Sequence, residues 1–262
     1  MEEITLYTKA DYVSMTSKLV IIVHGLAEHS GRYDELTKFL NEHNISVFRY
    51  DLRGHGKSGG KRGALRSYTE MLDDLQNIIT KVREQNKEAK IFLLGHSMGG
   101  LIVNLFASLQ GFDEISGVIS SGAATNFLPM IQALRIVPYR LIAFKKIKNN
   151  CEGLLAFDQS VEDAYKADPL VLKEYSISLI GAMFIDGVKT LLKNRRNLRL
   201  PILYLHGKDD MLVPCWCSEN MYEHIASVDK EIHIIEHSKH EIFNDYEKRK
   251  AFNAVLQWFN AH

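Results

Sequence analysis

Short apolar runs alternate along this chain with longer segments whose apolar residues recur at helical spacing. A short apolar run between polar segments is typical of a strand buried on both faces, whereas apolar residues three or four positions apart indicate an amphipathic helix. The pattern predicts strands at residues 19–23, 45–50, 91–94, 118–120, 201–205 and 232–235. It predicts helices at residues 33–42, 68–85, 101–109, 217–225 and 247–259. This alternation favours an α/β protein with a mostly parallel central sheet and helices on both faces.

One interval is too long to be a single connection between two strands. Residues 123–200 separate the fourth predicted strand from the fifth, and a crossover with its helix needs far fewer residues. We interpret the interval as an inserted, mostly helical cap, in which Ser160 begins the second helix. Its predicted helices are residues 127–144, 160–167 and 176–193. The sheet domain is then expected in two parts, residues 1–122 and 201–262.

Composition and charge narrow the functional class. The hydrophobic fraction of 46% and the charged fraction of 24% are those of an ordinary globular protein. The 32 basic and 32 acidic residues give a formal net charge of +0. Because neutralising phosphates requires a basic surplus, we expect no nucleic-acid partner.

The chain shows no sign of secretion or of membrane insertion. It has no basic segment followed by an apolar stretch at its start, and no run of about 18 apolar residues. The three cysteines, Cys151, Cys215 and Cys217, have neither the number nor the spacing of a disulfide framework or a zinc site. We therefore expect a cytoplasmic protein with free cysteines.

The third predicted strand leads into the segment Gly95-His96-Ser97-Met98-Gly99, and a predicted helix follows. This G-x-S-x-G pattern between a strand and a helix predicts a sharp turn that presents the serine hydroxyl above the carboxyl edge of the sheet. The two glycines let strand and helix approach closely, and the helix N-terminus faces the hydroxyl. We therefore predict that Ser97 is a nucleophile and that the Met98 amide helps to bind an oxyanion.

The other parts of such a site are expected in the loops after neighbouring strands. The amide of Leu26, after the first predicted strand, is the second candidate oxyanion donor. A serine nucleophile also needs a histidine base that is held by a carboxylate. Asp209 and Asp210 follow the fifth predicted strand, and His237 and His240 follow the sixth. Spacing does not choose within either pair, so both pairs stay open at this point.

Other polar residues near strand ends have simpler interpretations. We expect Asp51 to be a turn carboxylate and His24 to be a structural histidine that supports the loop after the first strand. No cluster has metal-ligand spacing, and no G-x-G-x-x-G sequence follows a strand. We therefore expect neither a metal nor a cofactor.

Four stretches of the chain resemble the monoacylglycerol lipase and lysophospholipase branch of the α/β-hydrolases, which are serine hydrolases. They are HGLAEHSGRY at residues 24–33, DLRGHGKS at 51–58, GHSMGG at 95–100 and YKADPL at 165–170. The run Glu-His-Ser-Gly-Arg-Tyr in the first stretch is the most diagnostic, because it is far rarer than the serine motif. The resemblance extends from about residue 19 to the C-terminus and implies an α/β-hydrolase fold.

The resemblance also implies roles for individual residues. The family's acid stands three residues after the glycine of the fifth-strand motif, which is Asp210, and its histidine precedes a Glu-Ile-x-Asn sequence, which is His240. Leu26 and Met98 match the family's oxyanion positions. Glu28 and Arg32 match residues near the glycerol end of a substrate, and the insertion at residues 123–200 matches a cap over an acyl tunnel.

The implied activity is that of a serine esterase without a cofactor. It would hydrolyse monoacylglycerols, small lipid esters, to fatty acid and glycerol through an acyl-enzyme. The alternatives are a lysophospholipase or a short-chain carboxylesterase with the same three catalytic residues. Less favoured are an aminopeptidase and a non-catalytic relative that only binds a ligand.

The insertion contains a basic segment that is relevant to where the protein is found in the cell. Within residues 126–150 there is no Asp or Glu, and apolar residues fill the gaps between the basic ones. The basic residues are Arg135, Arg140, Lys145, Lys146 and Lys148. Such a segment can bind peripherally to an anionic bilayer, here the inner membrane surface. The alternative is a cap helix that packs inward with solvated lysines.

Overall fold

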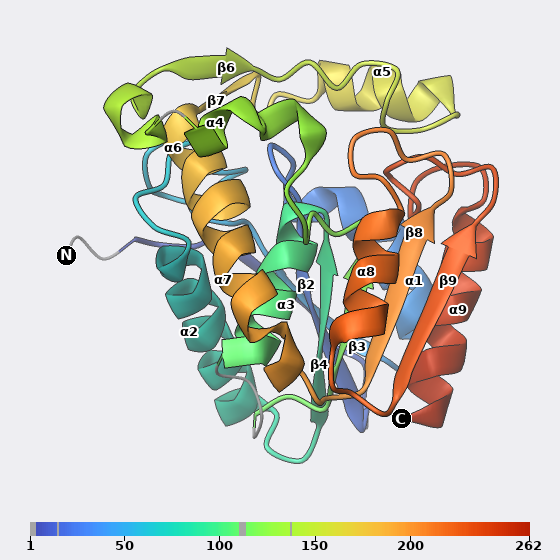
Figure 1. The fold of residues 1–262 in the computed structure, drawn as a ribbon. Coiled ribbons are helices and arrows are strands. Elements are labelled where there is room, and N and C mark those ends of the chain that lie inside the picture. Colours follow the sequence, from blue (N-terminus) through green and yellow to red (C-terminus); the bar gives the residue numbers. More distant parts are fainter. Residues whose placement is uncertain (1–3, 15, 110–113, 137) are drawn as a thin grey trace.

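The computed structural model describes residues 4–14, 16–109, 114–136 and 138–262 (Figure 1). Its centre is a seven-stranded sheet in the order β1-β3-β2-β4-β5-β8-β9. The strands are β1 (Thr8–Asp11), β2 (Lys18–Val23), β3 (Ser46–Tyr50), β4 (Lys90–His96), β5 (Gly117–Ser121), β8 (Ile202–Gly207) and β9 (Lys230–Ile235). Neighbouring strands are parallel except β1, which is antiparallel to β3. The structure therefore confirms the six predicted strands and the mostly parallel sheet.

The edge strand β1 was not predicted from the sequence. Its four residues, Thr-Lys-Ala-Asp, are partly or fully exposed and contain no alternating apolar pattern. An edge strand that is short and charged avoids pairing with other chains. Because such a strand lacks apolar residues, the apolar pattern of the sequence does not predict it.

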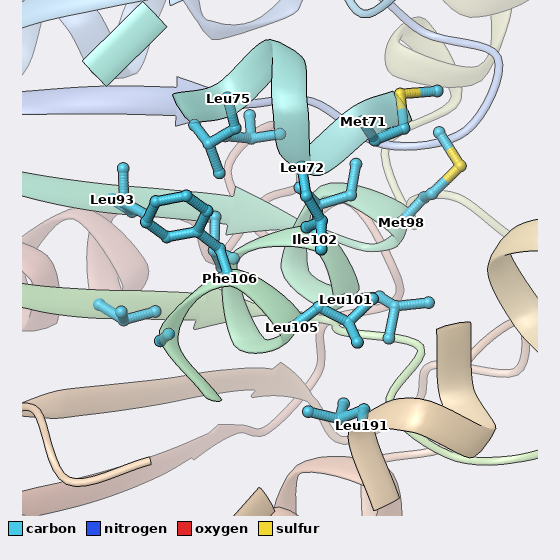
Figure 2. Packing of buried hydrophobic residues seen from close by; sticks show 14 of the residues in the cluster. Met71, Leu72, Leu75, Leu93, Met98, Leu101, Ile102, Leu105, Phe106 and Leu191 are labelled. Carbon is cyan, nitrogen blue, oxygen red and sulfur yellow. The ribbon is translucent and has the colours of Figure 1, made fainter. Parts of the chain in front are cut away.

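Helices cover both faces of the sheet, as predicted. They are α1 (Asp34–Glu42), α2 (Thr69–Gln85), α3 (Met98–Leu109), α7 (Val188–Asn194), α8 (Trp216–His224) and α9 (Lys248–Ala261). Because successive side chains of a strand point to opposite faces, β2 contributes to two separate cores. Leu19 and Ile21 pack in a cluster with α2, α3, α7 and α8, whereas Val20 and Ile22 pack in a cluster with α1 and α9. Figure 2 shows the first cluster where α2 meets α3.

The insertion departs from the predicted helices. It contains η2 (Pro129–Ile131), α4 (Ala133–Ile136), η3 (Tyr139–Ile142), β6 (Lys146–Lys148), α5 (Gln159–Ala167), β7 (Glu174–Ser176), α6 (Ile177–Ile180), the π-helical turn η4 (Gly181–Gly187), α7 and η5 (Arg195–Asn197). The prediction of one helix over residues 127–144 was wrong. Pro129 and Pro138 interrupt that segment, and a proline cannot donate the backbone hydrogen bond that a helix interior needs.

Two further details of the insertion correct the sequence analysis. The N-cap residue of helix α5 is Asp158 and not Ser160, because the Asp158 carboxylate accepts a hydrogen bond of 2.9 Å from the Ser160 amide. Strands β6 and β7 form an antiparallel pair that the sequence did not indicate, since each has only three residues.

The earlier part of the insertion lies above the sheet edge, whereas its later part packs into the main core. The elements α4, β6, β7 and α5 lie beyond the carboxyl edge of the sheet, at the top of Figure 1. The predicted helix at residues 176–193 forms as α6, η4 and α7, whose Leu179, Met183 and Leu191 belong to the same buried cluster as α3. The later part of the insertion is therefore packed into the main core on its way to β8.

None of the described helices combines the length and the apolar character that crossing a bilayer requires. Cys151, Cys215 and Cys217 are all free, as expected.

The close packing at the start of α3 leads us to expect that one added methyl group strongly destabilises the fold. A Cβ at Gly99 would lie 2.0 Å from the Val23 carbonyl oxygen at the end of β2. Gly99→Ala should therefore lower the free energy of unfolding by about 3 kcal/mol or more, measured as the urea midpoint. Gly187→Ala is the matched control, because its nearest neighbour would be 3.4 Å away, at Leu105. If both variants unfold at the parental urea concentration, the close approach at Gly99 is wrong.

Candidate active site

Ser97 occupies the turn between β4 and α3 and has a strained backbone. Its φ of 54° lies in the left-handed region that non-glycine residues rarely adopt. The surrounding backbone holds it there: its amide donates to Ser121 (2.8 Å), and its carbonyl oxygen accepts from Leu101 (3.1 Å) and Ala124 (3.3 Å). This strained turn between strand and helix is the conformation that the G-x-S-x-G sequence predicts.

The loop after β2 passes directly against this turn. A Cβ at Gly25 would lie 3.0 Å from the Cβ of Ser97. Neither the Leu26 amide nor the Met98 amide donates a hydrogen bond to a side chain or to a loop acceptor among the described residues. Met98 is the first residue of α3, where the helix dipole adds partial positive charge. Two free donors next to one serine can stabilise a negatively charged oxygen.

The structure selects between the two pairs that sequence spacing left open. His240 Nδ1 lies 2.6 Å from Asp210 Oδ2, and both side chains are buried. Asp209 and His237, by contrast, are exposed. Because Nδ1 donates to the carboxylate, Nε2 of His240 is left as the basic nitrogen. The positions of Asp210 and His240 therefore suit them for an acid and a base that act together.

Hydrogen bonds and charge set the ionisation of this pair. Burial alone would raise the pKa of Asp210, but His240 and His206 hold that pKa well below its usual value. The other oxygen of Asp210 accepts from the amides of Leu212 (2.9 Å) and Val213 (2.8 Å). Burial alone would lower the pKa of His240, and the Asp210 carboxylate raises it above the usual value.

His96, the residue before Ser97 in the chain, packs against the ring of His240. Its ring centre lies 4.7 Å from that of His240, and its Nδ1 is 3.0 Å from the Ser121 hydroxyl. Within the described residues no hydrogen bond joins the Ser97 hydroxyl to His240, a contact that commonly tightens only when substrate is bound. Burial holds the pKa of His96 well below its usual value, so this ring is neutral. The sequence did not indicate this role, because the variable position of the motif accepts any residue.

The two simpler interpretations agree with the structure. His24 Nε2 accepts a hydrogen bond from the Leu52 amide, and its Nδ1 lies 2.8 Å from the Gly25 carbonyl oxygen. Burial lowers its pKa to about 3, so His24 is a neutral, structural residue. The Asp51 carboxylate accepts from the amides of Ser30 (2.8 Å) and Lys57 (2.7 Å), as a turn carboxylate does.

Glu28 lies in the loop after β2 and Arg32 in the short 3-10 helix η1 (Ser30–Tyr33) that follows it, and both side chains have protein partners. One oxygen of Glu28 accepts from the Gly25 amide and from the Tyr33 hydroxyl. Arg32 forms an ion pair with Glu241, a residue that the sequence analysis did not single out. Contact of Glu28 and Arg32 with a substrate stays a prediction.

The described residues contain no group of three or more His, Cys, Asp or Glu side chains that could hold a metal ion. The arrangement offers a serine on a strained turn, a buried histidine paired with a carboxylate, and two backbone amides without a described side-chain or loop acceptor.

Comparisons with known proteins agree with this geometry. The family described as "Serine aminopeptidase, S33" matches residues 14–247. The monoacylglycerol lipase of Mycolicibacterium smegmatis is 30% identical over 248 residues, which cover 93% of this chain and 88% of the relative. The monoglyceride lipase of Rattus norvegicus is 29% identical, covering 92% of this chain and 80% of the relative. The crystal structure of the monoacylglycerol lipase of Paleococcus ferrophilus superposes with a TM-score of 0.86 at 33% identity, covering 97% of this chain and 98% of that one.

The geometry predicts that the adjacent residues Asp209 and Asp210 differ sharply in their effect on the reactivity of Ser97. Asp210→Asn should slow the modification of Ser97 by a fluorophosphonate by about 10³- to 10⁴-fold, because the neutral side chain no longer orients and stabilises His240. Asp209→Asn, at an exposed position, is the matched control and should react within about twofold of the parent. The reverse order of reactivity would make Asp209 the acid.

Proposed function

Because this chain belongs to the monoacylglycerol lipase branch of the α/β-hydrolases, we propose that it hydrolyses monoacylglycerols to a fatty acid and glycerol. It is a carboxylic ester hydrolase. The observation that carries the proposal is the buried Asp210–His240 pair, whose histidine ring lies 4.7 Å from that of His96, the residue before Ser97 on its strained turn. The named relatives support monoacylglycerol as the substrate.

The mechanism follows from the geometry. His240 Nε2 removes the proton from Ser97 as the serine oxygen attacks the ester carbonyl carbon. Asp210 keeps His240 in the correct tautomer and stabilises its protonated form. The amides of Leu26 and Met98 stabilise the oxyanion. The protonated histidine then gives its proton to the leaving glycerol, and water releases the fatty acid in a second round of the same steps.

In this proposal residues 123–200 are a cap that limits access to the site. The antiparallel pair of β6 and β7 and helix α5 lie beyond the carboxyl edge, where Ser97 and the strand-end loops are found (Figure 1). The cap also contacts the loop that carries Leu26. His29 is 2.8 Å from Asp168, and the Ala27 carbonyl oxygen accepts from the Leu172 amide at 2.8 Å.

The cap has a further property, which supports contact with a membrane. Ile136, Leu141 and Phe144 are 87%, 73% and 77% exposed, which is unusual for large apolar side chains. The five basic residues of the segment are exposed beside them. We propose that this surface binds peripherally to the anionic inner face of the cytoplasmic membrane, from which the lipid substrate is taken.

The activity is tested by replacing the nucleophile. Ser97→Ala should reduce monoacylglycerol hydrolysis at least about a thousandfold, because no covalent intermediate can form. Ser17→Ala, at an exposed position, is the matched control. The substrate panel should include lysophospholipids, short esters and an aminoacyl amide. Faster hydrolysis of any of these than of monoacylglycerol would overturn the proposed substrate but not the nucleophile.

The membrane contact is tested by charge reversal. Replacing Lys145, Lys146 and Lys148 with Glu should abolish co-sedimentation with anionic vesicles, since each basic residue near the surface contributes about 1 kcal/mol. Replacing three exposed lysines outside the cap, Lys38, Lys81 and Lys87, with Glu changes the net charge equally and is the control. Equal loss in both variants would indicate net charge rather than a cap surface.

A further inference from the structure

Three charged side chains are buried together next to the histidine base. Glu28 and Glu241 are each 4% exposed, and the Arg32 guanidinium lies between their carboxylates. Arg32 Nη2 forms the ion pair with Glu241, and Arg32 Nε is 3.7 Å from Glu28. Burying three charges is unfavourable unless each is well compensated, so their placement calls for a specific explanation.

The cluster joins two loops that must stay in register for the reaction. Glu28 accepts a hydrogen bond from the Gly25 amide, and the next residue, Leu26, provides a proposed oxyanion donor. Glu241 directly follows His240 in the chain. Arg32 therefore connects the loop that holds the oxyanion to the loop that carries the base.

Glu241 is also fixed by several contacts of its own. Its carboxylate accepts from Asn244 Nδ2 at 3.0 Å, and its carbonyl oxygen accepts from the amides of Asn244 (2.8 Å) and Asp245 (3.0 Å). Its amide donates to the Leu155 carbonyl oxygen in the insertion at 2.8 Å. A residue whose backbone and side chain are both held in this way can transmit its position to the residue before it.

We propose that Glu241 is a positioning residue for His240, which it holds in register with the oxyanion loop through its ion pair with Arg32. The inference rests on the hydrolase function proposed above. Glu241 acts through His240 and does not contact the substrate.

The charge of Glu241 should also change the pKa of His240. The charged and titratable groups around His240 are Asp210 on the loop after β8, which also contacts His206 of β8, then His96 of β4, and the cluster of Glu28, Arg32 and Glu241. Burial lowers the pKa of His240, whereas Asp210 and then Glu241 and Glu28 raise it. Removing the charge at Glu241 therefore lowers that pKa. Because the base acts in its neutral form, the acidic limb of the rate profile moves to lower pH.

The test uses Glu241→Gln, which keeps the side-chain shape and an oxygen acceptor for Asn244. We expect kcat for monoacylglycerol to fall about 10- to 100-fold with KM within about threefold of the parent. The acidic limb of the rate of Ser97 modification by a fluorophosphonate should move to lower pH. Glu236→Gln, an exposed residue of the same loop, removes the same charge and should change neither quantity. A parental kcat and an unmoved limb in Glu241→Gln would overturn the proposal.

A second variant separates positioning from folding. Glu241→Asp keeps the charge but shortens the side chain, so it should restore the parental pH midpoint while kcat stays reduced. An acidic limb in Glu241→Asp that lies below the parental midpoint would overturn the proposal, and this comparison with the parent can be made even if Glu241→Gln does not fold. The fluorophosphonate reaction needs no lipid. A parent that reacts with it but does not hydrolyse monoacylglycerol therefore contradicts the proposed substrate and leaves the role of Glu241 testable.

Discussion

The close approach of three backbone segments around Ser97 is the constraint on which the rest of the site depends. The end of β2, the end of β4 and the start of α3 come so near to one another that a Cβ at Gly95 would lie 2.3 Å from the Gly99 carbonyl oxygen. Glycine at these positions allows the approach, and Ser97 lies between them with a positive φ. The proposed oxyanion donors, the amides of Leu26 and Met98, are backbone groups in or directly after these segments, so the proposal requires no side chain for that task.

The strand order of the sheet separates Ser97 from His240, and a buried polar residue fixes the loop that brings them together. Ser97 follows β4, but the base follows β9, and β5 and β8 lie between these strands. The loop after β9 must therefore reach back across the carboxyl edge. The fully buried Asp245 anchors it by accepting from the amides of Lys239 (3.2 Å), Phe157 (2.9 Å) and Asp158 (3.1 Å). Backbone donors from the cap thus help to place the base, which ties the position of the cap to that of His240.

The limits of prediction from the sequence have physical causes. Apolar periodicity identified six of the seven strands of the central sheet and the helices that cover them. Five of these strands, β2, β3, β4, β5 and β8, are buried along almost their whole length, which leaves a strong apolar pattern, whereas the edge strand β9 is only partly buried. Periodicity failed for β1 and for the short elements of the insertion, where few side chains are buried. Spacing could not separate Asp209 from Asp210, since adjacent residues in a loop differ only in the direction they face. The pair of Arg32 with Glu241 spans 209 positions and has no local signal at all.

The excess negative charge of the cluster is consistent with a role at an esterase site. Burial and the nearby Glu241 raise the pKa of Glu28 to about 7, above its ordinary value of 4.5. Between these two values the folded chain binds more protons at this group than the unfolded chain, so its contribution to stability falls as pH rises and levels off above about 7. Once Glu28 is ionised, two carboxylates surround one guanidinium near His240. That surplus disfavours folding, but it favours the protonated histidine that forms when Ser97 attacks. The cluster therefore destabilises the fold in the same pH range in which it supports the reaction.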